Sequence, residues 1–325
     1  MAAALGVAGA SCGFGDGPTT DERGSIQHVV IVVKENHSFD NYFGSLEVPR
    51  SSLPRCESPV DQDQCQYDRS DIPEYYRYAT DFGYADNYFT DVLGPSWPND
   101  MMMIAAQTPL TSDPPLPLST WACPTTCYDL PTIGEELTHR RISWKSYGDE
   151  LYNPFRSINR YANDHAHNVE VSQLFDDIDS GSLPAVAWIR PSFPDSEHPG
   201  YDIHRGEQWT VSVIDAIMRS RVWQSTAILV TWDDAGNVTD HVTPPIVLGS
   251  PAGTVLRYGE RVPLLVISAF TKAGTVSHVV LSHVSLLKFI EDVFRLRPLT
   301  FRDRSANGLD GFFDLTMSLR APLVL

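Results

Sequence analysis

The sequence predicts an α/β fold in which a mostly parallel sheet lies between layers of helices. Three short runs rich in β-branched and other apolar residues, at 28–33, 227–232 and 262–267, are typical of strands buried on both faces of such a sheet. Two segments, 207–219 and 285–296, repeat apolar residues at helical spacing, so that each gains one apolar face. Strands that alternate with helices along a chain indicate a sheet covered on both sides.

The chain has 325 residues, enough for one large domain or two small ones. Residues 1–25 are rich in Gly, Ala and Ser without periodicity, so we expect a leader followed by a disordered arm. Cys12 follows AGAS, which weakly resembles a lipoprotein processing site, and a free thiol is the alternative. We expect residues 26–325 to form a single domain with loop insertions. No apolar run approaches the roughly 18 residues that a membrane-spanning helix needs.

The charge balance limits the kinds of partner. The chain carries 24 basic and 41 acidic residues, a formal net charge of −17. A nucleic-acid surface needs a basic stripe, so this class of partner is not expected. An acidic protein that handles an anionic substrate must import positive charge, and a bound metal ion is the usual means.

Four of the five cysteines form two close pairs in loop-like, proline-rich sequence. The pairs are Cys56 with Cys65 and Cys123 with Cys127, within the insertions expected at 47–77 and 108–131. Neither pair has CxxC spacing, and no histidine lies at the spacing of a zinc knuckle, so we favour two local disulfides over zinc. Disulfides in turn indicate an oxidising compartment, and hence a secreted or cell-envelope protein.

Two of the predicted strands run directly into oxygen-rich polar residues. Glu35 and Asn36 follow the first strand, and Asp233 and Asp234 follow the second. Open α/β sheets bind ligands at the carboxyl ends of their strands, and adjacent carboxylates repel one another unless a positive charge lies between them. These residues are therefore candidate ligands of a divalent cation. The alternative is a set of solvated loop acids.

A serine and several histidines complete the list of candidate functional residues. Ser96, in GPSWPND, precedes an apolar segment that we expect to be helical, which places it where a helix N-terminus favours an anion. Taken alone, Ser96 is also a good N-cap residue. His198 and His241 lie in polar loops, where a histidine can act as a general acid, a ligand or a surface residue. No GxSxG elbow follows a predicted strand, and P-loop, HExxH and GxGxxG motifs are absent from the sequence.

In chain order, ENHSFDNYFG, GPSWPN, WIRPSFPDSEHP, TAILVTWDDAGNVTDH and RVPLLVISAF resemble one family. These are the bacterial phosphoesterases of the alkaline phosphatase superfamily, which include phospholipases C and secreted acid phosphatases. The resemblance implies a helix-covered parallel sheet and ester hydrolysis through a phosphoserine. It implies that Ser96 is the nucleophile, that Glu35, Asn36, Asp233 and Asp234 bind the metal, and that Asn99, His198 and His241 face the phosphoryl oxygens or the leaving group.

Several positions depart from the pattern of that family. Trp97 and Asp100 stand where relatives often have other residues, including a basic one, and Asp234 is shorter than the usual Glu. We expect a secreted enzyme that hydrolyses phosphate monoesters, with calcium or magnesium favoured over zinc because the ligands are mostly oxygens. Two alternatives stay open: a phospholipase C that recognises a phospholipid headgroup, and a metal- or phosphate-binding protein without turnover. The sequence does not predict an oligomeric state.

Overall fold

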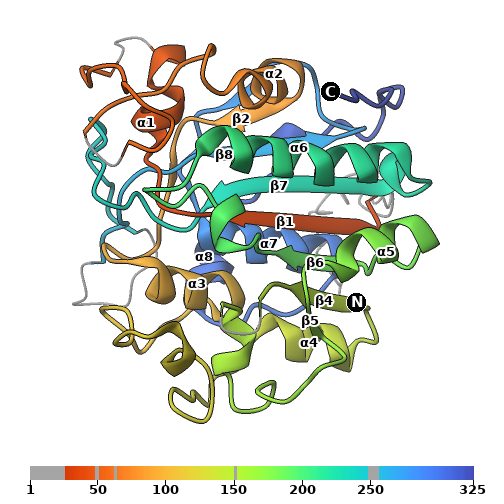
Figure 1. The fold of residues 1–325 in the computed structure, drawn as a ribbon. Coiled ribbons are helices and arrows are strands. Elements are labelled where there is room, and N and C mark those ends of the chain that lie inside the picture. The colour runs from red at the N-terminus through yellow and green to blue at the C-terminus, as the bar shows by residue number, and fades with distance from the viewer. Residues whose placement is uncertain (1–25, 48–50, 62–63, 150–151, 248–255) are drawn as a thin grey trace, which may run out of the picture.

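In the computed structural model of the chain, residues 26–47, 51–61, 64–149, 152–247 and 256–325 are described. Within these ranges, eight strands form a central sheet in the order β5-β4-β6-β1-β7-β8-β2-β9 (Figure 1). Their bounds are β1 His28–Lys34, β2 Gly83–Ala85, β4 Trp144–Tyr147, β5 Asn168–Val169, β6 Val186–Ile189, β7 Thr226–Trp232, β8 Leu264–Ser268 and β9 Thr275–Ser277. A second, two-stranded sheet pairs β3 Tyr88–Phe89 with β10 Leu281–Ser282.

The three strands predicted from the sequence form the middle of the large sheet. β1 pairs in parallel with β6 on one side and with β7 on the other, and every residue from Val29 to Val33 is buried. β8 runs antiparallel to both β7 and β2. A parallel neighbour needs a crossover, usually a helix, whereas no helix is assigned in the described parts of the chain between β7 and β8. The sheet is therefore mostly parallel, as predicted, with one strand reversed.

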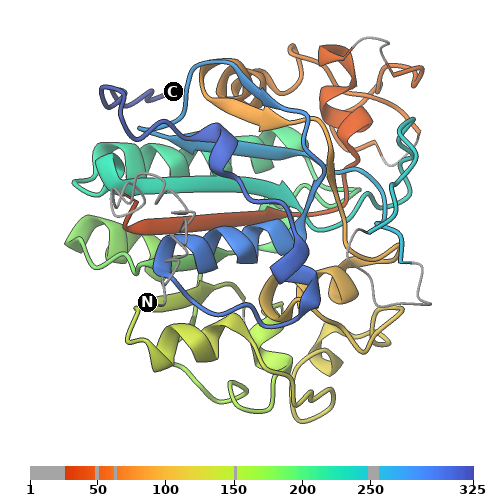
Figure 2. The same cartoon turned by 180° about the vertical axis from the view of Figure 1, so that it is seen from behind.

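Helices cover both faces of the sheet. Figure 1 shows α5 and α6 in front of the strands, and Figure 2 shows α7 on the opposite face, where it packs against α3. The helices are α1 Phe39–Phe43, α2 Pro73–Asp81, α3 Ser96–Ala105, α4 Ile133–His139, α5 Gln173–Ser180, α6 Ile203–Arg219, α7 His283–Phe294 and α8 Phe301–Ser305.

The two long predicted helices begin earlier than their apolar periodicity suggests. α6 starts after Asp202, whose side chain accepts a hydrogen bond from the backbone N–H of His204. α7 starts after Ser282, which forms a capping box with Ser285. Side-chain caps satisfy the free N–H groups of a first turn, so they set where a helix begins more than periodicity does.

The two cysteine pairs form disulfides, Cys56–Cys65 and Cys123–Cys127. The first insertion is not wholly loop, because its last residues form α2, which begins at Pro73. Glu207 of α6 supplies the cap of α2, since its Oε1 accepts the N–H groups of Glu74 and Tyr75, each at 2.8 Å. A cap from such a distant residue leaves no local sequence signal.

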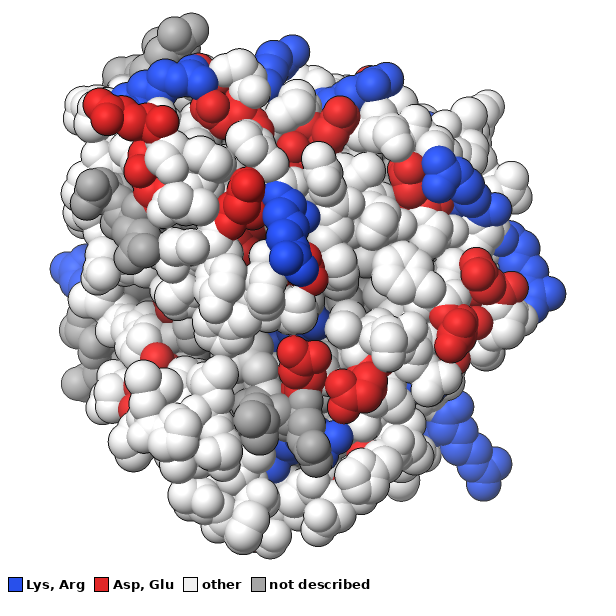
Figure 3. Space-filling model, in the orientation of Figure 1, with Lys and Arg blue, Asp and Glu red and all other residues white. Residues whose placement is uncertain are grey.

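The surface in Figure 3 carries basic side chains singly among acidic ones. None of the helices in the described residues combines the length and the apolar character that crossing a membrane requires.

Candidate active site

Three neighbouring strands end at one edge of the sheet, and each is followed by a charged residue. Glu35 follows β1, Asp233 follows β7 and Arg190 follows β6. Because β6, β1 and β7 are adjacent and parallel, their carboxyl ends bring these side chains together. The predicted grouping of Glu35 with Asp233 at one sheet edge therefore agrees with the fold.

Ser96 meets this group from helix α3. It is the first residue of the helix, and the N-cap residue, Pro95, makes no side-chain capping bond. The Ser96 hydroxyl instead donates to Asp234 Oδ2 at 3.1 Å and lies 3.5 Å from both Glu35 Oε2 and Asn36 Oδ1. In this structure Ser96 is thus not an N-cap, and its side chain points into the cluster of candidate ligands.

Each of the three carboxylates has one oxygen fixed by the protein. Glu35 Oε1 accepts from Arg190 at 2.7 Å and from Tyr152, and Asp234 Oδ1 accepts from the N–H of Gly236. Asp233 Oδ1 accepts two backbone N–H groups, at 2.8 and 3.0 Å. The second oxygens of Glu35 and Asp234 face Ser96, and Asp233 Oδ2 is buried without a hydrogen-bond partner among the described residues.

The electrostatics of this cluster fit a cation. Burial raises the pKa of the Glu35 carboxyl well above its usual range, and the nearby charge of Asp233 raises it further. The pKa of Asp234 is raised well above its usual range by the same two causes in the same order. Buried carboxylates with an unpartnered oxygen are costly unless a positive charge compensates them. A divalent cation with oxygen ligands fits this donor set.

Asn36 reaches the cluster through an unusual backbone. Its φ of 57° is left-handed, a conformation that Asn tolerates better than most residues. Gly236 approaches from the opposite loop, also with positive φ (59°), and a Cβ atom there would lie 3.1 Å from Asn36 Cβ. This close approach explains why the β7 loop carries a glycine at that position.

A pocket of about 380 Å³ opens beside the cluster. Asn36 and Asp234 contribute to its wall, together with Pro95 next to Ser96. Leu93 and Glu260 also line it, and Leu93 is 72% exposed. A substrate therefore has room to approach Ser96 past an apolar and an acidic residue.

His241 lies in a second group of potential ligands. Asp40, Glu47 and His241 bring ligand-type atoms within 4.8 Å of one another, and His241 Nδ1 lies 2.9 Å from both Asp40 oxygens. The guanidinium of Arg261 already binds Asp40 at 3.1 Å and Glu47 at 2.6 and 2.8 Å. A fixed cation at this position fits a salt-bridge cluster better than a metal site.

Asn99 and His198 make contacts outside the Ser96 cluster. Asn99 is fully buried, and its amide bonds the backbone of the turn before Ser96, at Val92, Gly94 and Pro95. His198 is half-buried, packs against Phe193, and places Nδ1 3.0 Å from the carbonyl of Pro199. Their predicted contacts with a phosphoryl group stay predictions.

Sequence reasoning missed Arg190 and Tyr152, which fix Glu35. Arg190 is buried, stacks its guanidinium 4.5 Å from the centre of the Tyr152 ring, and forms an ion pair with Asp100 of α3. Asp100, which the resemblance singled out, is thus the partner of a buried arginine. The available signal was the position of Arg190 directly after a buried strand.

Helix α3 also has an acidic partner at its first turn. Asp113, from the second insertion, accepts the backbone N–H of Trp97 at 2.8 Å. Burial raises the pKa of the Asp113 carboxyl, and the charge of Asp233 adds to this. An N–H group that a bound anion would use is therefore taken by a carboxylate in this structure.

A family model described as the Phosphoesterase family matches residues 26–64 and 57–297. The chain belongs to this family. Phospholipase C B of Mycobacterium tuberculosis (strain CDC 1551 / Oshkosh) is 24% identical to this phosphoesterase over 396 residues, covering 86% of the chain and 75% of the relative. Hemolytic phospholipase C of Pseudomonas aeruginosa is 23% identical and covers 83% of the chain, which spans about half (53%) of that relative.

Solved structures resemble the phosphoesterase in fold. A protein of the alkaline phosphatase superfamily from Vibrio parahaemolyticus aligns with a TM-score of 0.51 and 13% identity, over 87% of this chain and 70% of that one. Murine ectonucleotide pyrophosphatase / phosphodiesterase 5 aligns with a TM-score of 0.52 and 9% identity, over 89% and 100%. At such identities the likeness concerns the fold alone, and it confirms the alkaline-phosphatase-like architecture predicted from the sequence.

The family places the protein among the phosphoric ester hydrolases, as the sequence predicted. The oxygen-rich cluster around Ser96 agrees with a divalent metal ion as cofactor. The two disulfides agree with an extracytoplasmic protein.

Proposed function

We propose that this phosphoesterase is a metal-dependent enzyme that attacks phosphate esters with Ser96. The observation that carries the proposal is the Ser96 hydroxyl, which lies within 3.5 Å of oxygens of Glu35, Asn36 and Asp234. A serine that served only to start a helix would have no reason to face three side-chain oxygens, two of which belong to the buried carboxylates of Glu35 and Asp234.

The metal would be held by Glu35, Asn36, Asp233 and Asp234. A metal ion bound there would lower the pKa of the Ser96 hydroxyl and would neutralise negative charge on the phosphate. The oxygen donor set favours Ca²⁺ or Mg²⁺ over Zn²⁺.

Ser96 then acts as the nucleophile. Its Oγ forms a bond to phosphorus while the bond to the leaving oxygen breaks, and the hydroxyl proton passes to solvent. The leaving oxygen gains a proton from a histidine, for which His198 and His241 are the candidates. Water next attacks the phosphoserine, and Ser96 leaves as the free hydroxyl. Asn99 supports this sequence by fixing the turn that carries Ser96.

For the substrate, we favour a phosphodiester of the phospholipid headgroup type over the monoester that the sequence alone suggested. Relatives named phospholipase C support this choice. The pocket does so too: Leu93 offers an apolar contact, and Glu260 suits a cationic substituent better than a second phosphate charge. A soluble phosphate monoester is the second candidate, and binding of metal or phosphate without turnover is the third.

The domain organisation and the cellular location of the protein are also proposals. Residues 26–325 would act as one catalytic domain, secreted or held in the cell envelope. The predicted leader at 1–25, and a lipid anchor on Cys12, lie outside the described residues.

The test compares para-nitrophenyl phosphorylcholine with para-nitrophenyl phosphate, using the wild type and Ser96→Ala, with and without a chelator. We expect both chelator and substitution to remove turnover, by a factor of at least about 10³ for the loss of the nucleophile. The ratio between the two substrates decides between the first two candidates. Full activity in Ser96→Ala would sink the mechanism. Metal binding without activity on either substrate would favour the third candidate.

A further inference from the structure

The loop that carries His198 is fastened to the segment that carries the candidate metal ligands. Three successive carbonyls of this loop accept hydrogen bonds from residues at the end of β1 and just beyond it. The bonds are Lys34 Nζ to Asp195 O at 2.5 Å, Glu35 N to Ser196 O at 3.0 Å, and His37 Nε2 to Glu197 O at 2.7 Å. Because the third carbonyl belongs to the residue before His198, these bonds fix the position of the backbone at His198.

Glu197 also fixes the loop through its side chain. Its carboxylate is fully buried and receives four donors from β1, β7 and the helices beyond β1. They are Lys34 Nζ at 3.0 Å and Tyr75 OH at 2.5 Å on Oε1, and Tyr42 OH at 2.9 Å and Trp232 Nε1 at 3.1 Å on Oε2. Both oxygens are therefore committed, and neither is free to serve as a proton carrier or metal ligand.

The backbone of Glu197 is held in a conformation that it would not choose alone. Its φ is 70°, in the left-handed region, which is strained for a residue other than glycine. Helix α6 packs so closely that a Cβ atom on Gly206 would lie 2.2 Å from Glu197 Cγ. Such a backbone persists only where surrounding contacts enforce it, and here the four donors do so.

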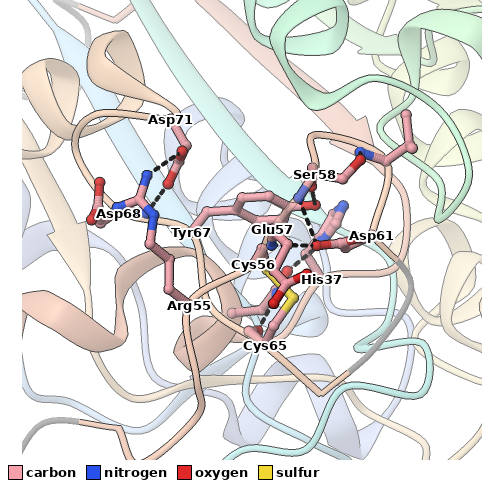
Figure 4. Close-up of a disulfide and its surroundings, with 12 residues drawn as sticks. His37, Arg55, Cys56, Glu57, Ser58, Asp61, Cys65, Tyr67, Asp68 and Asp71 are labelled. Carbon is pink, nitrogen blue, oxygen red and sulfur yellow. Dashed lines mark hydrogen bonds and ion pairs between the residues drawn. A yellow bond between two sulfur atoms is a disulfide. The ribbon is translucent and has the colours of Figure 1, made fainter.

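The outer side of this arrangement is anchored as well. His37 stacks on Tyr42 at 4.2 Å and contacts Asn41 Oδ1 at 2.5 Å through its second nitrogen. Asn41 Nδ2 donates to the carbonyl of Cys65 at 2.6 Å, and Figure 4 shows His37 beside the Cys56–Cys65 disulfide. Contacts thus run from the disulfide, through His37, to the carbonyl that precedes His198.

We infer that Glu197 is a positioning residue: its buried carboxylate holds His198 in place relative to Glu35 and Asn36, so that His198 can protonate the leaving oxygen. The inference rests on the proposed function, in which a histidine supplies that proton. It selects His198 over His241, because His241 is tied to the separate Arg261 cluster through Asp40. An alkoxide leaving group needs the proton, whereas nitrophenolate leaves without it.

The test measures turnover of an ester with an alkoxide leaving group, short-chain phosphatidylcholine, against para-nitrophenyl phosphorylcholine. Glu197→Gln replaces one carboxylate oxygen with an NH₂ group, which cannot accept a hydrogen bond. Each oxygen receives two of the four donors, so at least two donors lose their acceptor. We expect the alkoxide ester to lose at least about tenfold more activity than the nitrophenyl ester. His198→Ala should show the largest selective loss, because it removes the proposed proton donor itself. The double variant, Glu197→Gln with His198→Ala, should lose no more than His198→Ala alone. Should the enzyme prefer monoesters, glycerol 2-phosphate and para-nitrophenyl phosphate replace the pair.

Two further variants keep the result interpretable. Tyr75→Phe removes a single donor and should give a smaller loss of the same selective kind if Glu197→Gln does not fold. Glu207→Gln is the matched control, because Glu207 is also a buried glutamate but caps α2 instead of holding the His198 loop, and the variant should leave the ratio unchanged.

An equal loss on both esters in Glu197→Gln, or a further selective loss in the double variant, would overturn the inference. A wild-type ratio in His198→Ala overturns it as well, by removing the role that Glu197 is inferred to support. The proposed function fails separately, through turnover that survives in Ser96→Ala.

Discussion

Arg190 Nη1 donates to Glu35 Oε1 at 2.7 Å, so the candidate metal ligand that follows β1 is held by the residue that follows β6. The other guanidinium nitrogen forms an ion pair with Asp100, four residues after Ser96 on α3. One buried arginine therefore connects the strand that bears a ligand to the helix that bears the candidate nucleophile. This arrangement couples the stability of the sheet edge to the geometry of the site.

Arg190→Met should strongly destabilise the protein. The substitution leaves Asp100 buried without its cation and removes one of the two groups that bind Glu35 Oε1, and breaking a buried pair in this way typically costs about 3–5 kcal/mol. Urea unfolding in the presence of a chelator measures the loss. Adding Asp100→Leu should recover part of it, because the uncompensated charge is then absent.

The matched control is Arg77→Met, whose side chain is 51% exposed and pairs with the 43% exposed side chain of Asp81 at 3.6 Å. An exposed pair of this kind is worth roughly 0–1 kcal/mol. A free energy of unfolding for Arg190→Met within about 1 kcal/mol of wild type would contradict the coupling described above.

These contacts show what the sequence could and could not predict. Glu35, Asp233 and Ser96 were found because each lies at a boundary visible in the local pattern, the end of an apolar strand or the start of an apolar helix. Arg190 follows a strand too, but its role depends on β6 lying beside β1, and strand order is not written in a local pattern. Glu197 was out of reach for the same reason, since its donors come from four separate segments.

The fold shows the same division. Periodicity located the strands and the two long helices, whereas their first residues depended on caps. Helix α2 was hidden because it begins inside a segment that is predicted to be a loop insertion and because its cap comes from Glu207, more than 130 residues later. The antiparallel β8 was likewise not predicted, since direction depends on the path of the preceding loop.

Asp233→Asn should have opposite effects on the metal-free and the metal-bound protein. The change removes one of three clustered charges but keeps an Oδ1 that can accept both backbone N–H groups now bound by Asp233. Less repulsion should raise the melting temperature in chelator by a few degrees, the equivalent of about 1 kcal/mol. Metal affinity should fall by at least about 100-fold, because even changes to residues behind a ligand cost 10- to 100-fold.

Calorimetric titration with Ca²⁺ and Mg²⁺, together with thermal melts with and without metal, checks both parts. Asp179→Asn, which alters an exposed acid on α5, is the control and should change neither quantity. Unchanged metal affinity in Asp233→Asn would remove Asp233 from the set of ligands.

Glu207 makes the stability of the protein depend on pH in a direction that can be worked out. Burial is the main cause that raises its pKa to about 8, well above the value near 4.5 that an exposed glutamate has. Between these two values the folded protein binds a proton that the unfolded chain has released, so stability falls as pH rises through this window and levels off above it. The substitution Glu207→Gln tests this dependence, because it keeps the side-chain oxygen that caps α2 but cannot ionise. The free energy of unfolding of the variant should therefore match that of the wild type near pH 4.5 and exceed it by on the order of 2 kcal/mol near pH 9. Urea unfolding at both pH values measures the difference, and a gain of equal size at the two values would assign the effect to packing instead of ionisation.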